Sequence, residues 1–239
     1  MIRPPSYEGR GLVNLVAEIE RRLTGTSPSP GTDRELSRLI PDADTYVLVL
    51  FDGLGDHQLA HRSAAPLLAD RMASLDAPFP TTTAVSLATV ATGLAPRSHG
   101  IVGYHMWFEG VSSPVNVLKW TTPWGDPVPF HVESVLPAPN LWERLSQAGR
   151  EPVTVQPGSF AGSPLSRMLY RGCRFEQAWS EAEIAEATID LATRPGRMVF
   201  TYVPYVDVAA HMEGQDSHAY EQALAAAGRI WRQIASRLP

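Results

Sequence analysis

Two carboxylates and a histidine stand near the ends of apolar segments of the chain. Asp52 directly follows the apolar run 45–51, and Asp207 follows the apolar run 198–206. His211 lies four residues after Asp207, so on a helix the two side chains project from the same face. Aspartate oxygen and histidine nitrogen are ligands that zinc-type divalent ions accept. The spacing therefore permits a metal site, although each feature alone also fits a structural role, as a cap or a helix-start ion pair.

A threonine cluster precedes a predicted helix of small residues. The sequence FPTTT, ending at Thr83, runs directly into AVSLATVATG. A threonine at the start of a helix can cap it through its side-chain oxygen. It can also act as a nucleophile, because the N–H groups of a helix N-terminus favour a phosphate beside it and a nearby metal lowers the pKa of the hydroxyl. Local sequence favours the cap, so the nucleophile hypothesis depends on the other motifs.

Strands and helices alternate along most of the chain. Apolar runs without polar alternation predict buried strands over 45–51, 152–155 and 198–206. Apolar spacing and end signals predict helices over 12–23, 63–75, 84–92, 141–147, 180–192 and 218–238. This order indicates an α/β fold with a central, mostly parallel sheet flanked by helices. Such sheets bind ligands beyond the carboxyl ends of their strands, where we expect Asp52 and Asp207 to meet.

Residues 103–138 interrupt this alternation. The segment is rich in aromatic residues and proline and has no sustained period, which predicts a loop-rich insertion or cap. Trp107, Trp120 and Trp124 could line a substrate there, although burial in a core is the commoner fate of tryptophan.

Composition excludes several classes of protein. The 239 residues include 20 basic and 25 acidic side chains, for a net charge of −5, so we expect no binding to nucleic-acid polymers. No apolar run approaches the roughly 20 residues that cross a bilayer, and we expect no membrane partner. Cys173 is the single cysteine, which excludes an intramolecular disulfide. The first residues lack the profile of a secretory signal, so a cytoplasmic location is predicted.

Three motifs together resemble a known family. VLVLFDGLG, then FPTTTAVSLATVATGLAPRSHGIVG, then YVPYVDVAAHMEG resemble the type I phosphodiesterase and nucleotide pyrophosphatase branch of the alkaline phosphatase superfamily, in the family's order and over about residues 40–239. The resemblance implies an alkaline-phosphatase-like α/β fold. It also implies two divalent metal ions, zinc with manganese as the alternative, and a threonine that is transiently phosphorylated or nucleotidylated. The expected ligand is a small phosphate ester or nucleotide.

The resemblance assigns roles residue by residue. Asp52 matches the aspartate of one metal site, and Thr83 matches the nucleophile that also contacts that metal. Asp207 and His211 match two ligands of the other site. Tyr104 occupies the place where nucleotide-active members have an asparagine that holds phosphoryl oxygens, so its phenolic O–H is the candidate substrate donor. The pair His99-Gly100 matches the HG pair of the family, which we interpret as structural.

One family motif is absent from this sequence. The family completes its metal sites with a DHG motif on a strand after the DxxxH helix and with one further histidine near its end, and no DHG motif follows Asp207 here. We therefore expect residues 1–239 to be a single, incomplete domain that lacks its C-terminal part and the second half of the metal ligands. The intact protein is predicted to be a metal-dependent phosphodiesterase or nucleotide pyrophosphatase. The alternatives are a non-catalytic remnant and a phosphomonoesterase or phosphonate hydrolase of the same superfamily. The sequence leaves the oligomeric state open.

Overall fold

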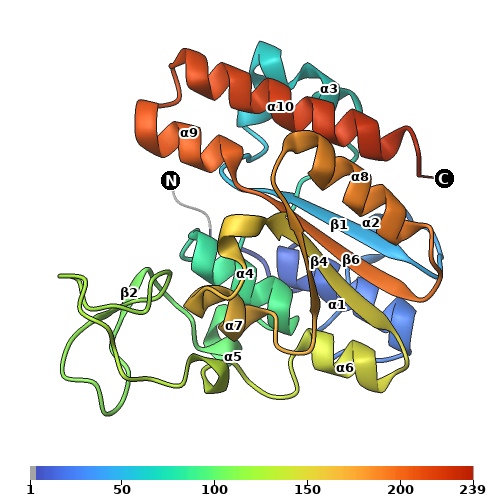
Figure 1. The fold of residues 1–239 in the computed structure, drawn as a ribbon. Coiled ribbons are helices and arrows are strands. Elements are labelled where there is room, and N and C mark those ends of the chain that lie inside the picture. Colours follow the sequence, from blue (N-terminus) through green and yellow to red (C-terminus); the bar gives the residue numbers. More distant parts are fainter. Residues whose placement is uncertain (1–3, 239) are drawn as a thin grey trace. The chain divides into compact units, whose positions relative to one another are not determined.

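The computed structural model describes residues 4–238, which form two compact units (Figure 1). The helical unit comprises the chain up to residue 43 together with 75–150 and 162–173. The sheet unit comprises 44–74, 151–161 and the chain from residue 174 onward. The prediction of a single domain over 1–239 stays a prediction.

The sheet unit is built on parallel strands. They are β1 (Tyr46–Phe51), β4 (Glu151–Pro157), β5 (Arg174–Ala178) and β6 (Arg197–Val203), in the spatial order β1-β6-β4-β5. Every pairing in this sheet is parallel, with Leu50 opposite Tyr202 and Phe51 opposite Val203. The predicted α/β fold with a mostly parallel central sheet is therefore confirmed. Because the strands are parallel, their carboxyl ends share one edge, which we call the carboxyl edge.

Burial explains which strands the sequence reveals. All residues of the central strand β6 are buried, and β4 is buried over most of its length, so both read as continuous apolar runs. The strand β5, RFEQA, was not predicted because three of its five residues are polar. Edge position alone does not explain this, since β1 is the other edge strand and is apolar throughout. The strand predicted over 198–206 is corrected at its end. It stops at Val203, and Pro204 precedes a helix.

Helices complete the sheet unit. They are α3 (Ala65–Ala69), α8 (Glu181–Ala192), α9 (Tyr205–Glu213) and α10 (His218–Ala235), with short 3-10 turns η1 (Gln58–Ala60), η2 (Arg62–Ala64) and η4 (Gly158–Phe160). Apolar residues of α8 and α10, including Ile184 and Ile230, pack with Val199 of the sheet in one core. Ser180 caps α8 by accepting the N–H of Glu183.

The helix predicted over 63–75 is shorter than expected. Its α-helical part ends at Ala69, because the following residues make polar contacts outside a helix. The Arg71 guanidinium binds the Asp56 carboxylate, and the Ser74 hydroxyl donates to the same carboxylate at 2.8 Å. Arg71 and Ser74 together hold the pKa of Asp56 low, at about 2.

The helical unit contains α1 (Leu12–Thr24), α2 (Arg34–Ser37), α4 (Thr83–Thr92), α5 (Pro96–His99), α6 (Leu141–Gln147) and α7 (Pro164–Leu169). The predictions over 12–23, 84–92 and 141–147 agree with α1, α4 and α6. An ion pair between the buried Glu20 and the partly buried Arg144 joins two of these helices, since Arg144 Nε lies 2.6 Å from Glu20 Oε1. The guanidinium of Arg144 also donates to the carbonyl of Thr92, at the end of α4.

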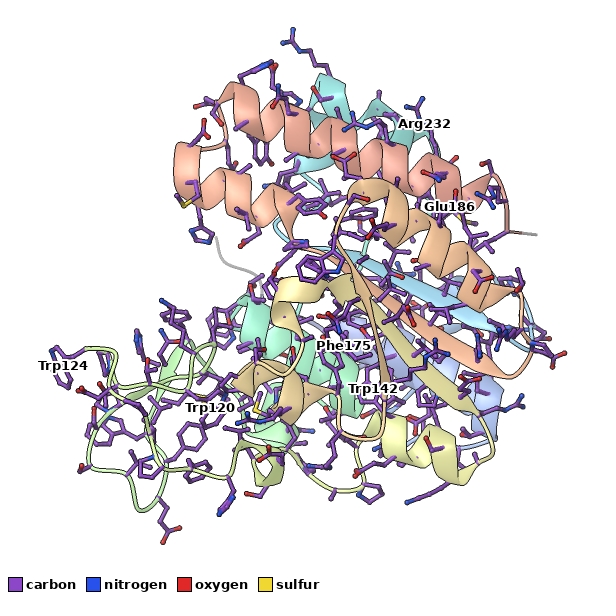
Figure 2. The ribbon with its side chains drawn as sticks, viewed as in Figure 1. Trp120, Trp124, Trp142, Phe175, Glu186 and Arg232 are labelled. Atoms are coloured by element: carbon purple, nitrogen blue, oxygen red, sulfur yellow. The ribbon has the colours of Figure 1, made fainter. Side chains whose placement is uncertain are left out.

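Residues 103–138 of the helical unit are mostly loops. They contain β2 (His105–Met106) paired antiparallel with β3 (Val115–Asn116), and the 3-10 turn η3 (Val132–Ser134). Trp120 is buried and stacks on Phe130, whereas Trp107 and Trp124 are 65% and 79% exposed. Figure 2 shows Trp124 at the outer end of this segment. Burial is therefore the outcome for Trp120 alone, and the cap remains a prediction.

His99 is a buried, neutral side chain that holds the HG turn. Its Nδ1 accepts the N–H of Ile101 at 3.1 Å, so the ring proton resides on Nε2, which lies 3.1 Å from Thr89 Oγ1. Gly100 ends α5 at a φ of +83°, a conformation that favours glycine. Burial lowers the pKa of His99 to about 4. These contacts agree with the structural role expected for this pair.

The His99→Gln variant should flatten the acid side of the stability curve. In the unfolded chain His99 binds a proton near pH 6.5, but the folded protein resists protonation until about pH 4. Between these values the wild type loses stability as pH falls, by about 2–3 kcal/mol from pH 7 to 4.5. Urea unfolding of both proteins at pH 7 and 4.5 measures the difference. Equal losses in the two proteins would contradict the assignment.

Candidate functional site

The backbone joins the two acid-bearing strand ends. Asp52 follows β1, and Asp207 lies in the first turn of α9, which follows β6. The N–H of Asp52 donates to Val203 O at 2.9 Å, and the N–H of Asp207 donates to Asp52 O at 3.1 Å. The predicted meeting of Asp52 and Asp207 at the carboxyl edge is thus observed.

Gly53 permits this approach. Its φ is +74°, and a Cβ added there would lie 2.6 Å from the Cα and 2.7 Å from the N of Asp207. Those are backbone atoms, which cannot move aside as a flexible side chain can. A glycine directly after Asp52 is therefore a steric condition for the contact between the two segments.

The side chains at this edge place two negative charges close together. Asp52 Oδ2 accepts the O–H of Tyr202 at 2.6 Å, and Oδ1 accepts the N–H of Gly53 at 3.1 Å. His211 Nε2 lies 3.6 Å from Asp207 Oδ1, so the DxxxH pair shares one helix face, as its spacing predicted. Burial raises the pKa of Asp207, the charge of Asp52 raises it further, and His211 opposes both.

This donor set suits a divalent cation. Two carboxylates and an imidazole match the ligand preferences of zinc-type ions, and a cation would relieve the repulsion that raises the pKa of Asp207. Among the described residues no three His, Cys, Asp or Glu side chains are grouped as a ready metal site. Asp52, Asp207 and His211 therefore offer part of a ligand set.

Thr83 belongs to the helical unit, where it is the first residue of α4. The N-cap of this helix is Thr82, and Ser86 donates the first intrahelical bond to Thr82 O at 3.0 Å. Local sequence favoured Thr83 as the N-cap residue, but Thr82 occupies that position. The backbone amides from Thr83 to Val85 precede the first intrahelical bond and form the N-terminal turn of α4.

Tyr104 also lies in the helical unit, just before β2. Its side chain is 42% exposed, and its phenolic oxygen accepts the Asn116 Nδ2–H at 2.8 Å. The phenolic proton is a separate donor, so this contact is compatible with the predicted substrate-binding role.

Aromatic residues that the sequence did not single out also occupy the carboxyl edge. Trp179 follows β5, is 71% exposed, and lies on Gly158, where an added Cβ would be 2.3 Å from Trp179 Cζ2. The ring of Phe160 lies 6.2 Å from that of Tyr202. A tryptophan after a strand is the signal that could have revealed Trp179, but it depends on recognising β5.

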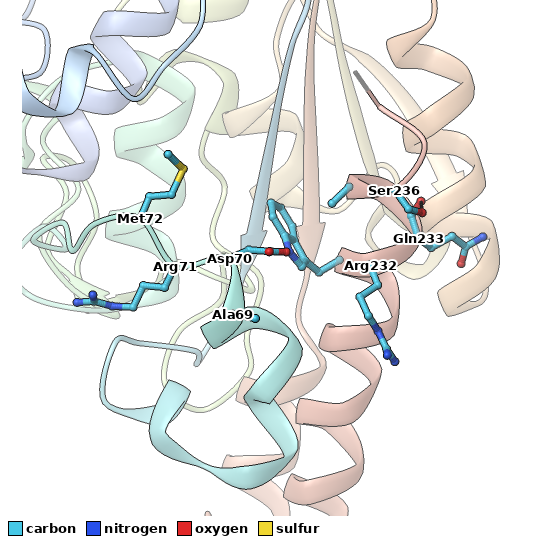
Figure 3. Close-up of a pocket in the computed structure, with 9 residues that line it drawn as sticks. Ala69, Asp70, Arg71, Met72, Arg232, Gln233 and Ser236 are labelled. Atoms are coloured by element: carbon cyan, nitrogen blue, oxygen red, sulfur yellow. Dashed lines mark hydrogen bonds between the residues drawn. The ribbon is translucent and has the colours of Figure 1, made fainter.

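A surface groove of the sheet unit lies elsewhere. It has a volume of about 870 Å³ and lies between the end of α3 and the last turns of α10 (Figure 3). Trp231 Nε1–H donates to Asp70 Oδ2 at 2.6 Å across it. Asp52, Asp207 and His211 do not line this groove, so the groove is not part of the candidate site.

Comparison with known proteins identifies the family. The sequence profile of the type I phosphodiesterase/nucleotide pyrophosphatase family matches residues 46–239. The chain belongs to this family. A search of curated protein sequences finds no significant match. Within residues 4–238, no helix is long and apolar enough to cross a bilayer.

Solved structures agree with this type I phosphodiesterase fold. Two structures of murine ectonucleotide pyrophosphatase/phosphodiesterase 5 match with TM-scores of 0.54 and 0.55 at 17% and 16% identity. The second is an inactive threonine-to-alanine variant in complex with AMP. Each match covers 80% of this chain and 51% of the solved chain, so the chain spans about half the length of these relatives. The predicted alkaline-phosphatase-like fold is confirmed.

The Gly53→Ala variant should destabilise the sheet unit and separate the two acids. We expect the free energy of unfolding to fall by about 2–4 kcal/mol, because left-handed strain and a backbone clash add together. Gly149→Ala is the matched control, since Gly149 has the same φ of +74° but an added Cβ meets nothing within 4 Å. Urea unfolding measures both variants. If both lose the same stability, the close approach at Gly53 carries no cost of its own.

Proposed function

We propose that this chain carries the nucleophile and half of the metal ligands of a phosphoric ester hydrolase that acts on phosphodiesters or nucleotide pyrophosphates. The observation that carries the proposal is the carboxylate pair Asp52 and Asp207, joined through the backbone and accompanied by His211 at the carboxyl edge. Family membership over residues 46–239 supports the reaction class.

Two divalent ions are part of the proposal. Asp207 and His211 would hold one ion, and Asp52 with the Thr83 hydroxyl would hold the other. Zinc is the expected metal and manganese the alternative. When bound, such ions lower the pKa of a hydroxyl nucleophile and stabilise charge on the reacting phosphate.

Thr83 is the proposed nucleophile. Its Oγ1 attacks phosphorus as the bond from phosphorus to the leaving oxygen breaks, and the resulting threonine ester is then hydrolysed by water. The N–H groups in the first turn of α4 donate to the phosphoryl oxygens. The Tyr104 O–H is the proposed additional donor, in place of the amide that the family resemblance leads one to expect.

The proposed substrate has a nucleoside part. One structurally similar protein is in complex with AMP, which supports a nucleotide ligand. The exposed Trp179 offers a flat apolar surface at the carboxyl edge. Aromatic rings stack on any base because every base presents a π face. The alternative is a hydrolase that prefers phosphomonoesters or phosphonates. Comparing the rates of hydrolysis of a phosphodiester, a phosphomonoester and a phosphonate with the same leaving group distinguishes these preferences.

A non-catalytic fold is the second candidate. The observation in its favour is that residues 4–238 contain no group of three metal-ligating side chains. Titration with zinc or manganese distinguishes the two, because stoichiometric binding with turnover supports the hydrolase, whereas absence of both supports the remnant.

The Thr83→Ala variant tests the nucleophile. In the complete hydrolase with zinc or manganese present, we expect hydrolysis of a nitrophenyl phosphodiester to fall by at least about a hundredfold, because the covalent route is lost. Thr81→Ala is the matched control, since Thr81 is an exposed threonine two residues earlier. Spectrophotometric release of nitrophenol measures the rates. An unchanged rate in Thr83→Ala would refute the mechanism.

The Trp179→Ala variant tests the nucleoside surface. For a nitrophenyl nucleoside monophosphate we expect KM to rise about tenfold or more, in line with about 1–3 kcal/mol per stacked base. A methyl nitrophenyl phosphate lacks the base, so its KM should not change. Trp179→Phe keeps an aromatic face and should restore most of the affinity. Equal effects on both esters would show that Trp179 acts otherwise.

A further inference from the structure

Sheet register brings a tyrosine of β6 beneath the first acid. Tyr202 pairs with Leu50 across the parallel β1 and β6 strands, so the two side chains point to the same face of the sheet. Asp52 lies two residues beyond Leu50 and continues that face. A tyrosine is long enough to reach one residue pair further along, and its hydroxyl meets Asp52 Oδ2 at 2.6 Å.

The Tyr202 ring is held in place by packing. The residue is 5% exposed, and its ring lies 6.2 Å from the ring of Phe160, which belongs to the η4 turn after β4. A buried ring with fixed neighbours presents its O–H in one direction. The hydroxyl is therefore a preorganised donor rather than a mobile one.

The Asp52 carboxylate receives donors on both oxygens. Tyr202 O–H binds Oδ2, and Gly53 N–H binds Oδ1 at 3.1 Å. The two contacts approach from different elements, so together they oppose rotation of the carboxylate about its Cβ–Cγ bond. Each carboxylate oxygen still has a second lone pair, which then points in a fixed direction.

We infer that Tyr202 is a positioning residue for the Asp52 ligand, an inference that rests on the metal site proposed above. Its O–H would hold the Asp52 carboxylate in one orientation, so that the carboxylate would meet an ion without first having to be ordered. Hydrogen bonds to a ligating carboxylate change metal affinity by 10–100-fold in other sites. Tyr202 is not a metal ligand itself, and it acts only through Asp52.

Metal titration of the whole chain tests the inference without an activity measurement. The probe is manganese(II), followed by EPR at constant pH, with the wild type, Tyr202→Phe, Asp52→Asn and the double variant. We expect Tyr202→Phe to weaken binding tenfold or more. We expect the double variant to bind no more weakly than Asp52→Asn, because a residue that acts through Asp52 has nothing left to position.

Tyr220→Phe is the matched control. Tyr220 is a buried tyrosine of the same unit, and its hydroxyl has no hydrogen-bond partner within the described part of the chain. Its loss should leave the manganese affinity unchanged. Circular dichroism and melting temperatures of all variants show that affinity is compared between folded proteins.

Several outcomes would overturn the inference. Wild-type affinity in Tyr202→Phe would do so, as would a loss in that variant that adds fully to the loss in Asp52→Asn. An equal loss of manganese affinity in Tyr220→Phe would show that the effect does not depend on the contact with Asp52. If Asp52→Asn binds manganese like the wild type, the proposed metal site itself fails, and the inference about Tyr202 fails with it.

Discussion

The hydrogen bond from the Asp207 N–H to the Asp52 carbonyl holds together two segments that are far apart in the sequence. It requires parallel pairing of β1 with β6, and it requires a glycine at position 53, because any Cβ would enter the backbone of Asp207. The consequence is electrostatic. Two carboxylates are kept together at the carboxyl edge, and the raised pKa of Asp207 reflects its burial and, after that, their repulsion. Two carboxylates held close together are stabilised in their charged forms by a nearby positive charge, such as a bound cation.

The sequence predicts three of the four strands of the central sheet. The apolar runs of β4 and β6 are visible because both faces of those strands are buried. The run of β1 is equally apolar, although five of its six residues are only partly buried. The boundary after β6 is not visible, since Tyr205 and Val206 are as apolar as the strand but begin a helix after Pro204. The strand β5 was not predicted because Arg174, Glu176 and Gln177 interrupt its apolar residues, so it lacks the continuous apolar run of the other strands.

The candidate site divides in the same way. The convergence of Asp52, Asp207 and His211 follows from strand direction and helical spacing, both of which are local signals. Tyr202 and Trp179 depend on something else, namely which strands are neighbours and in what register. A hydrogen bond between β6 and the end of β1 exists only once the order β1-β6-β4-β5 is known. The sequence also could not show that Thr82, and not Thr83, is the N-cap residue of α4, because both residues are threonine.

The contact between Tyr104 and Asn116 bears on how a phosphoryl group would be held in the proposed reaction. An asparagine amide offers two N–H donors, whereas a phenol offers one O–H. Here the Asn116 amide donates to the phenolic oxygen, which polarises the O–H and strengthens it as a donor. One polarised donor still replaces two, so a larger share of the charge on the phosphoryl oxygens would fall to the backbone amides of α4. Backbone amides bind the charged phosphoryl oxygens and make no contact that depends on the ester group. Such binding favours hydrolysis of several esters over selectivity for one.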